Sequence, residues 1–225
     1  MCGMTKCLLI AATAALALSV PPAAAQTQAA PRAAAEQAAP ASPFRPLPEE
    51  QAFETEMVRI DTEAGPIILE IETERAPVTA ANFLRYVEEG RLENAAFYRA
   101  SQKIGAGKGF VQFGLRQHPD HVFPPIAHEP TTDTGLTHAD GTISMVRGEP
   151  GTADADFLIM VSDQPQWDAK GDSPGYAAFG RVVQGMETVK SILAAPTDPN
   201  KGDGVLRGEL LAEEIPVTGA SVVEE

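Results

Sequence analysis

Alternating apolar and polar residues mark where the folded part of this 225-residue chain begins. Ile67, Leu69 and Ile71 fall on one side of an extended segment, and the residues between them fall on the other. This two-residue period is typical of a strand that is covered on one face. We expect residues 57–61 to pair with this strand in a hairpin that turns at Gly65-Pro66.

Two stretches have the period of a helix instead. Ala76-Pro77-Val78 opens the first, and Gly90 is placed to end it. Its apolar stripe consists of Ala80, Phe83, Leu84 and Val87. The second helix is expected over residues 185–193, with an apolar stripe of Met186, Val189, Ile192 and Leu193.

Short apolar runs bounded by Gly, Pro and Asp predict the remaining strands. They cover residues 95–100, 109–113, 141–146, 157–161, 176–183 and 210–217. Many short strands indicate a barrel or a sandwich, and two isolated helices fit a closed sheet whose ends they plug. We therefore predict a mainly β domain.

The N-terminal region has a different pattern. Lys6 precedes an apolar run that stops at Pro21-Pro22, and Ala23-Ala24-Ala25 offers small residues for cleavage. The run is shorter than the roughly 20 residues of a membrane-spanning helix, so we favour a cleavable export signal over an anchor. The Ala- and Pro-rich segment that follows predicts a disordered linker. The expected parts are a signal peptide (1–25), a linker (26–55), a folded domain (56–218) and a tail (219–225).

Charge and cysteine usage exclude several functions. The formal net charge is -14, which argues against nucleic acid and anionic lipid as partners. Both cysteines, Cys2 and Cys7, lie in the expected signal peptide. The processed chain would therefore lack thiol catalysis, disulfides and cysteine-ligated metal.

Other signals are weaker. His118, His121 and His128 lie near Asp120 in a Pro-rich loop, which leaves a surface metal site open as an alternative. Residues 198–204 with Glu209 imitate a calcium loop, but the glycine is displaced. A Ser-His-Asp hydrolase is a further, weaker alternative.

The most informative chemistry lies in Phe97-Tyr98-Arg99 and in Gln112, which falls within a Phe-rich run. An arginine side chain stays protonated and presents a rigid set of donors. In an apolar groove it can polarise a bound group, but it cannot act as a base. The pattern therefore favours chemistry without a nucleophile.

A series of blocks in this order resembles the cyclophilin family of peptidylprolyl isomerases over residues 56–218. The blocks are Ala76-Pro77, Asn82-Phe83, Phe97-Tyr98-Arg99, Val111-Gln112, Gly141-Thr142-Ile143-Ser144-Met145, Asp156-Phe157-Leu158-Ile159 and Phe179-Gly180-Arg181-Val182-Val183-Gln184-Gly185-Met186. The resemblance implies an eight-stranded antiparallel barrel capped by two helices. It also implies a monomer that isomerises X-Pro bonds without a cofactor or a metal.

By the same resemblance, Arg99 donates to the prolyl nitrogen and Gln112 binds the substrate backbone and orients Arg99. The implied substrate-binding residues are Phe110, Val146, Leu158, Trp167 and Tyr176, the last at the position of a family histidine. We expect these side chains to share one groove. An Arg99 guanidinium that points away from the groove, or that a carboxylate holds, would count against this role.

Several residues depart from the family pattern. Gly109 stands where the family has the pocket phenylalanine, so Phe110 would have to lean into that space. The other departures are Phe113, Arg147, Asp156 and Gln166. They keep a second function open, a cyclophilin-like module that binds peptides or acts as a chaperone with little turnover. The expected partners are proline-containing peptides and unfolded exported proteins, in the periplasm or, as an alternative, outside the cell.

Overall fold

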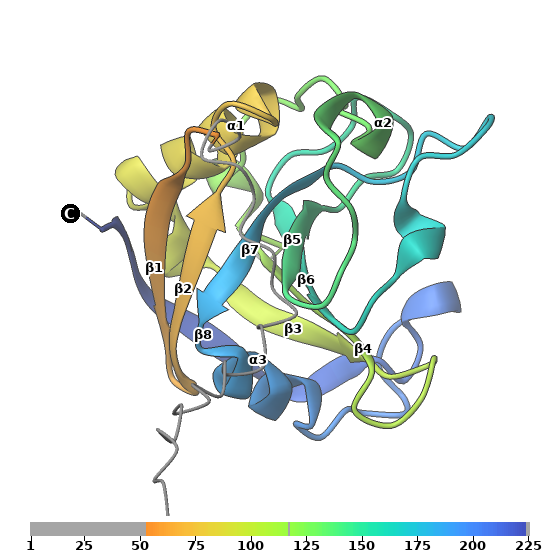
Figure 1. Ribbon diagram of the computed structural model, residues 1–225. Helices are drawn as coiled ribbons and strands as arrows, with labels where there is room; N and C mark the ends of the chain where they lie inside the picture. Colours follow the sequence, from red (N-terminus) through yellow and green to blue (C-terminus); the bar gives the residue numbers. More distant parts are fainter. Residues whose placement is uncertain (1–52, 117, 224–225) are drawn as a thin grey trace, which may run out of the picture. The chain divides into compact units, whose positions relative to one another are not determined.

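Eight antiparallel strands close into a barrel in the computed structural model, which describes residues 53–116 and 118–223 (Figure 1). Around the barrel the order is β1-β2-β7-β5-β6-β4-β3-β8. The strands are β1 (Glu56–Thr62), β2 (Gly65–Ile71), β3 (Ala96–Ser101), β4 (Gly109–Gly114), β5 (Thr142–Met145), β6 (Asp156–Val161), β7 (Ala178–Gln184) and β8 (Leu210–Val222). The predicted fold class is confirmed. The expected signal peptide and all but the end of the linker lie outside the described residues.

Two helices cover opposite ends of the barrel, α1 (Pro77–Glu88) and α3 (Met186–Leu193) (Figure 1). The stripe predicted for α1 is buried, and its Phe83 meets Phe157 edge-on at 5.0 Å between ring centroids. A third helix, α2 (Thr131–Thr134), is a single turn. Within residues 53–116 and 118–223, no helix is long and apolar enough to cross a membrane.

Strand β8 is longer than the sequence predicts. It continues to Val222, whose partner across the ladder is Val58 of β1. The boundaries placed at 217 for the strand and at 218 for the domain are therefore too early, since residues 219–222 close the barrel. Polar and small residues in this stretch hide its strand character, because one of its faces is exposed.

A β-bulge in β3 sets the direction of two side chains. Phe97 pairs with Phe113, but the next pair is Arg99 with Gln112, so Tyr98 is an extra residue in the ladder. Phe97 and Ala100 face the core. Tyr98 and Arg99 therefore both leave the core, and both reach side chains that lie outside the barrel wall.

Candidate active site

A cavity of about 340 Å³ opens beside β3 and β4. Four of the predicted site residues line it, Arg99, Phe110, Trp167 and Tyr176. The remaining lining residues are Ser101, Lys103, Ile104, Gly109, Gln164, Gln166, Val205 and Glu209. The structure thus brings a cation, three aromatic rings and several amides to one concave surface, the usual composition of a small-ligand site.

The apolar part of the cavity rests on a small cluster outside the main core. Phe110, Leu158 and Met160 are buried in this cluster, and Val146 and Trp167 pack against it. Leu158 and Val146 support Phe110 but are not among the residues that line the cavity. Sequence analysis missed Met160, although alternation along β6 places it on the same face as Leu158.

The departures at Gly109 and Phe113 have separate physical causes. Gly109 has a φ of +143°, and a Cβ there would lie 1.8 Å from the carbonyl oxygen of Ser101. No side chain fits at that position, and the neighbouring Phe110 enters the cavity instead. Phe113 points into the barrel, with its ring 4.7 Å from that of Phe97, so it does not alter the cavity.

Tyr176 lines the cavity, and Arg147 contacts its ring without lining the cavity itself. The Arg147 guanidinium lies 4.9 Å from the Tyr176 ring, and its Nε donates to the Gly175 carbonyl at 3.0 Å. On its other side Tyr176 packs against Trp167, with 4.9 Å between the ring centroids. Arg147 therefore braces an aromatic wall through a cation–π contact.

Arg99 lies in the cavity with a defined orientation. Its guanidinium carbon is 4.8 Å from the Phe110 ring centroid, and Nη1 donates to Oε1 of Gln112 at 3.0 Å. The side chain is only 15% exposed. The predicted pairing of Arg99 with Gln112 is present, and the guanidinium does not point away from the groove.

A carboxylate also holds Arg99, and sequence analysis did not foresee it. Nε donates to Oε2 of Glu209 at 2.8 Å, Nη2 lies 2.6 Å from the same oxygen, and Lys103 pairs with the other oxygen of the carboxylate. Burial opposes ionisation of Glu209, but Lys103 and Arg99 outweigh it and lower its pKa. The negative charge therefore stays beside the guanidinium.

A carboxylate that holds Arg99 counts against its catalytic role only if it occupies all of the guanidinium donors. A guanidinium has five N–H groups. Glu209 accepts from Nε and lies against Nη2, and Gln112 accepts from Nη1. Because Nη1 and Nη2 each carry two N–H groups, each keeps one for a bound peptide. Glu209 thus reduces the net charge of the site but leaves donors available. Glu209 is 110 residues from Arg99 in the sequence, so no local pattern could have shown the contact.

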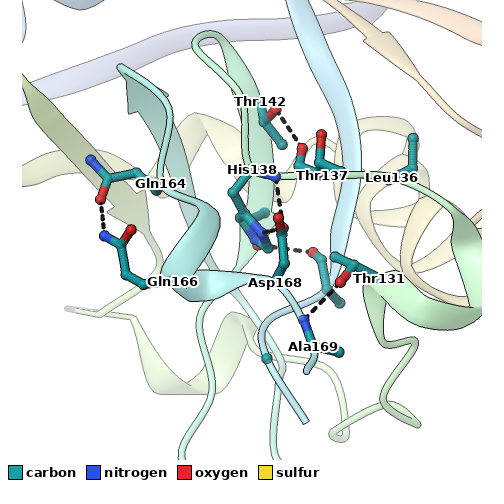
Figure 2. Close-up of polar contacts among 12 residues, drawn as sticks. Thr131, Leu136, Thr137, His138, Thr142, Gln164, Gln166, Asp168 and Ala169 are labelled. Carbon is teal, nitrogen blue, oxygen red and sulfur yellow. Dashed lines mark hydrogen bonds and ion pairs between the residues drawn. The ribbon is translucent and has the colours of Figure 1, made fainter. Parts of the chain in front are cut away.

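Residues of a Ser-His-Asp arrangement do meet, but in the barrel wall. His138 Nδ1 lies 2.7 Å from Oδ1 of Asp168, and Nε2 lies 2.9 Å from Oγ of Ser144; Figure 2 shows His138 against Asp168. Burial lowers the pKa of His138 more than Asp168 raises it, so the imidazole is neutral. Ser144 is fully buried and cannot meet a substrate. This Ser-His-Asp arrangement therefore offers no accessible nucleophile.

The metal alternatives receive no support from the described residues. Within them, no three His, Cys, Asp or Glu side chains gather as metal ligands. His128 contacts the Pro174 carbonyl, and Glu209 of the supposed calcium loop is committed to Arg99 and Lys103. A larger cavity of about 670 Å³ contains Arg75 and Arg181, which pair with glutamates, and none of the predicted site residues.

Comparisons with known proteins agree with this geometry. The family model described as "Cyclophilin type peptidyl-prolyl cis-trans isomerase/CLD" matches residues 57–210. The chain is 35% identical over 150 residues to the peptidyl-prolyl cis-trans isomerase cyp18 of Streptomyces antibioticus, covering 64% of this chain and 87% of that protein. It is 30% identical over 172 residues to peptidyl-prolyl cis-trans isomerase B of Escherichia coli, covering 75% and 100% respectively.

Solved structures share the fold. A cyclophilin type peptidyl-prolyl cis-trans isomerase of Cryptosporidium parvum superposes with a TM-score of 0.62 at 21% identity, covering 76% of this chain and 99% of that one. The same protein solved in the presence of the dipeptide Ala-Pro gives a TM-score of 0.60 at 21% identity, covering 75% and 99%. At this identity the likeness concerns the barrel alone.

Proposed function

The chain belongs to the cyclophilin-type peptidyl-prolyl cis-trans isomerase family, and from this premise we propose that it accelerates X-Pro rotation in exported proteins with Arg99 as the catalytic donor. The observation that carries the proposal is the guanidinium of Arg99 over Phe110 in the cavity, with Gln112 at its side. Uncatalysed isomerisation takes tens to hundreds of seconds, which is slow enough to limit folding.

The chemistry requires stabilisation of a twisted amide. Resonance in the planar bond gives a rotation barrier of about 18–20 kcal/mol. Twisting breaks this resonance and localises the lone pair on the prolyl nitrogen. A donor directed at that lone pair binds the twisted form better than either planar isomer, which lowers the barrier. The two N–H groups that Glu209 and Gln112 leave free on Arg99 are suited to this task.

The walls of the cavity support binding of a proline-containing peptide. Phe110, Trp167 and Tyr176 offer apolar surface to a pyrrolidine ring, while the exposed Gln166 offers an amide to a peptide backbone. A proline ring carries no charge, so an apolar pocket can hold the ring while one oriented donor fixes the position of the peptide. A homologous barrel has been solved in the presence of Ala-Pro, which agrees with this substrate class.

An exchange assay by NMR on a short X-Pro peptide tests the proposal. We expect Arg99→Ala to lower kcat/KM about 100-fold, the usual loss when one transition-state donor is removed. Arg59→Ala is the matched control, since Arg59 also pairs with a carboxylate but lies on β1 outside the cavity. Equal rates for wild type and Arg99→Ala would overturn the role of Arg99.

A second function has one observation in its favour. Glu209 offsets part of the positive charge of Arg99, which would suit a module that holds peptides with little turnover. The same assay separates the two functions. Peptide binding together with exchange at the uncatalysed rate would select the binding module, whereas exchange that depends on Arg99 selects the isomerase.

A further inference from the structure

The bulge in β3 gives Arg99 a neighbour on the same face of the barrel wall. Residues next to each other in a regular strand point to opposite faces, so one of Tyr98 and Arg99 would face the core if the ladder were regular. The extra residue instead directs both Tyr98 and Arg99 away from the core. Gln112 on the adjacent strand β4 reaches both of them, since it accepts from Arg99 and donates to the Tyr98 hydroxyl.

These hydrogen bonds form a chain in which donors and acceptors can be assigned in only one way. A guanidinium has donors only, so the Gln112 amide must present its oxygen to Arg99 and its nitrogen to Tyr98. The Tyr98 hydroxyl accepts that hydrogen bond and donates its own to Oδ1 of Asp156, at 3.0 Å. An ionised carboxylate only accepts, so Asp156 fixes the direction from its end.

The position of Asp156 at the start of β6 depends on a glycine on the neighbouring strand. Gly114 pairs with Asp156 in the ladder, and a Cβ on Gly114 would lie 2.1 Å from Oδ1 of Asp156. Only glycine leaves room for the carboxylate there. The guanidinium of Arg116 covers the outer side of the Tyr98 ring, at 5.2 Å from its centroid.

Three groups on the neighbouring elements affect the charge of Asp156. Burial raises the pKa of Asp156 to about 6, and Asp154 raises it as well. The hydrogen bond from Tyr98 and the charge of Arg116 act in the opposite direction. The carboxyl therefore changes its charge within the range in which an exported protein can work, whereas burial raises the pKa of Tyr98.

We propose that Tyr98 and Asp156 are positioning residues for the isomerase reaction, which hold the Gln112 amide in the orientation that presents Arg99 to the prolyl nitrogen. The inference rests on the proposed role of Arg99. Neither Tyr98 nor Asp156 lines the cavity, so they act through Gln112 and not on the peptide.

Removing the Tyr98 hydroxyl is the first test. We expect Tyr98→Phe to lower kcat about three- to ten-fold with KM nearly unchanged, the effect of losing one hydrogen bond that orients a catalytic group. Tyr86→Phe is the control, because it removes a buried hydroxyl of α1 that accepts from the backbone N–H of Phe123. A wild-type kcat in Tyr98→Phe, or an equal loss in Tyr86→Phe, overturns the inference.

The Asp156 end is tested by stability and pH together. A raised pKa means that this group stabilises the fold below pH about 4 and loses that contribution as pH rises through about 6. At pH 7.5, Asp156→Asn should therefore raise the thermal midpoint while lowering kcat. Replacement of a purely structural residue would lower both the thermal midpoint and kcat, or neither of them. Either result overturns the assignment.

The pH profile gives an independent readout. Wild-type kcat should fall below pH about 6, because a protonated Asp156 is a weaker acceptor for Tyr98. The profile of Asp156→Asn should lack this step. A flat wild-type profile, or an unchanged step in Asp156→Asn, overturns the inference.

One further variant separates this inference from the proposed function. Tyr98→Phe should have no additional effect when Arg99→Ala is already present. If Arg99→Ala alone has no effect, the proposed function fails. If Arg99→Ala lowers the rate and Tyr98→Phe does not, only the positioning role fails.

Discussion

Arg99 is held between two acceptors of different character. Gln112 is neutral and connects to the barrel wall, whereas Glu209 is charged and comes from the segment just before β8. Such a side chain loses little rotational freedom when a peptide binds, because the protein has already restricted it. The contact with Glu209 orients Arg99 but reduces the net positive charge of the site.

The contribution of Glu209 is measurable as stability. We expect Glu209→Gln to destabilise the fold by about 1–2 kcal/mol near neutral pH, since charged hydrogen bonds to Arg99 and Lys103 become neutral. Urea denaturation of both proteins at several pH values measures this difference.

The pH dependence has a definite sign. The pKa of Glu209 is lowered on folding, so its contribution is present above its ordinary value of 4.5 and is lost as pH falls through the lower folded value. The gap between wild type and Glu209→Gln should therefore narrow in acid. A gap that stays constant would contradict the proposed charge on Glu209.

Site residues could be predicted where the sequence carries a local signal. Arg99 belongs to one of the blocks that carry the resemblance, which also implied Phe110 and Trp167, and all three line the cavity. Glu209 could not be found this way, because nothing near it in the sequence points to Arg99. Nor could the roles of Tyr98 and Asp156, which depend on a bulge whose extra residue has no compositional mark.

At the scale of elements, one buried polar cluster ties the cavity wall to the barrel. The 3₁₀ turn η4 (Pro165–Trp167) carries Trp167, and the next residue, Asp168, accepts from the backbone N–H and lies beside the imidazole of His138. Ala169 donates to Oγ1 of Thr131 in α2, as Figure 2 shows. These contacts fix the turn from both sides, so the Trp167 ring has a stable place over Phe110.

Acid should weaken this cluster. The pKa of His138 is lowered on folding, mainly by burial, so the neutral imidazole favours the fold above its ordinary value of 6.5. That stability is lost as pH falls towards the folded value, because the unfolded chain binds the proton first. His138→Asn should therefore show a shallower loss of unfolding free energy between pH 7 and 5 than wild type does. His118→Asn, in an exposed loop, is the control, and equal slopes for all three proteins would refute this account.

The elements themselves were largely predictable, because periodicity reports burial directly. Alternation at Ile67, Leu69 and Ile71 gave β2, and the stripe around Phe83 gave α1. The end of β8 was not predictable, since Gly219 and Ala220 carry little strand propensity and pair only because β1 lies beside them. Tertiary contact, not local preference, sets that boundary.

At the scale of the whole molecule, we propose that the folded barrel carries out catalysis and that the N-terminal segment directs export. We expect the full chain, when produced in a Gram-negative bacterium, to appear in the periplasm with Gln26 as its first residue. Mass spectrometry of the fractionated protein measures this. A variant lacking residues 2–25 should remain in the cytoplasm with the same isomerase rate, and an exported protein that retains Met1 would contradict cleavage.

The pairing of β1 with residues 219–222 leaves the barrel without an open edge, which matters for the proposed binding of unfolded proteins. An open sheet presents a row of unsatisfied amides and carbonyls, which is a template for aggregation. Over the part of the chain that the structure describes, each strand has a neighbour on both sides. Under the proposed function, an unfolded protein would find no free strand edge in the described barrel to pair with, and its binding would depend on the side chains that line the cavity.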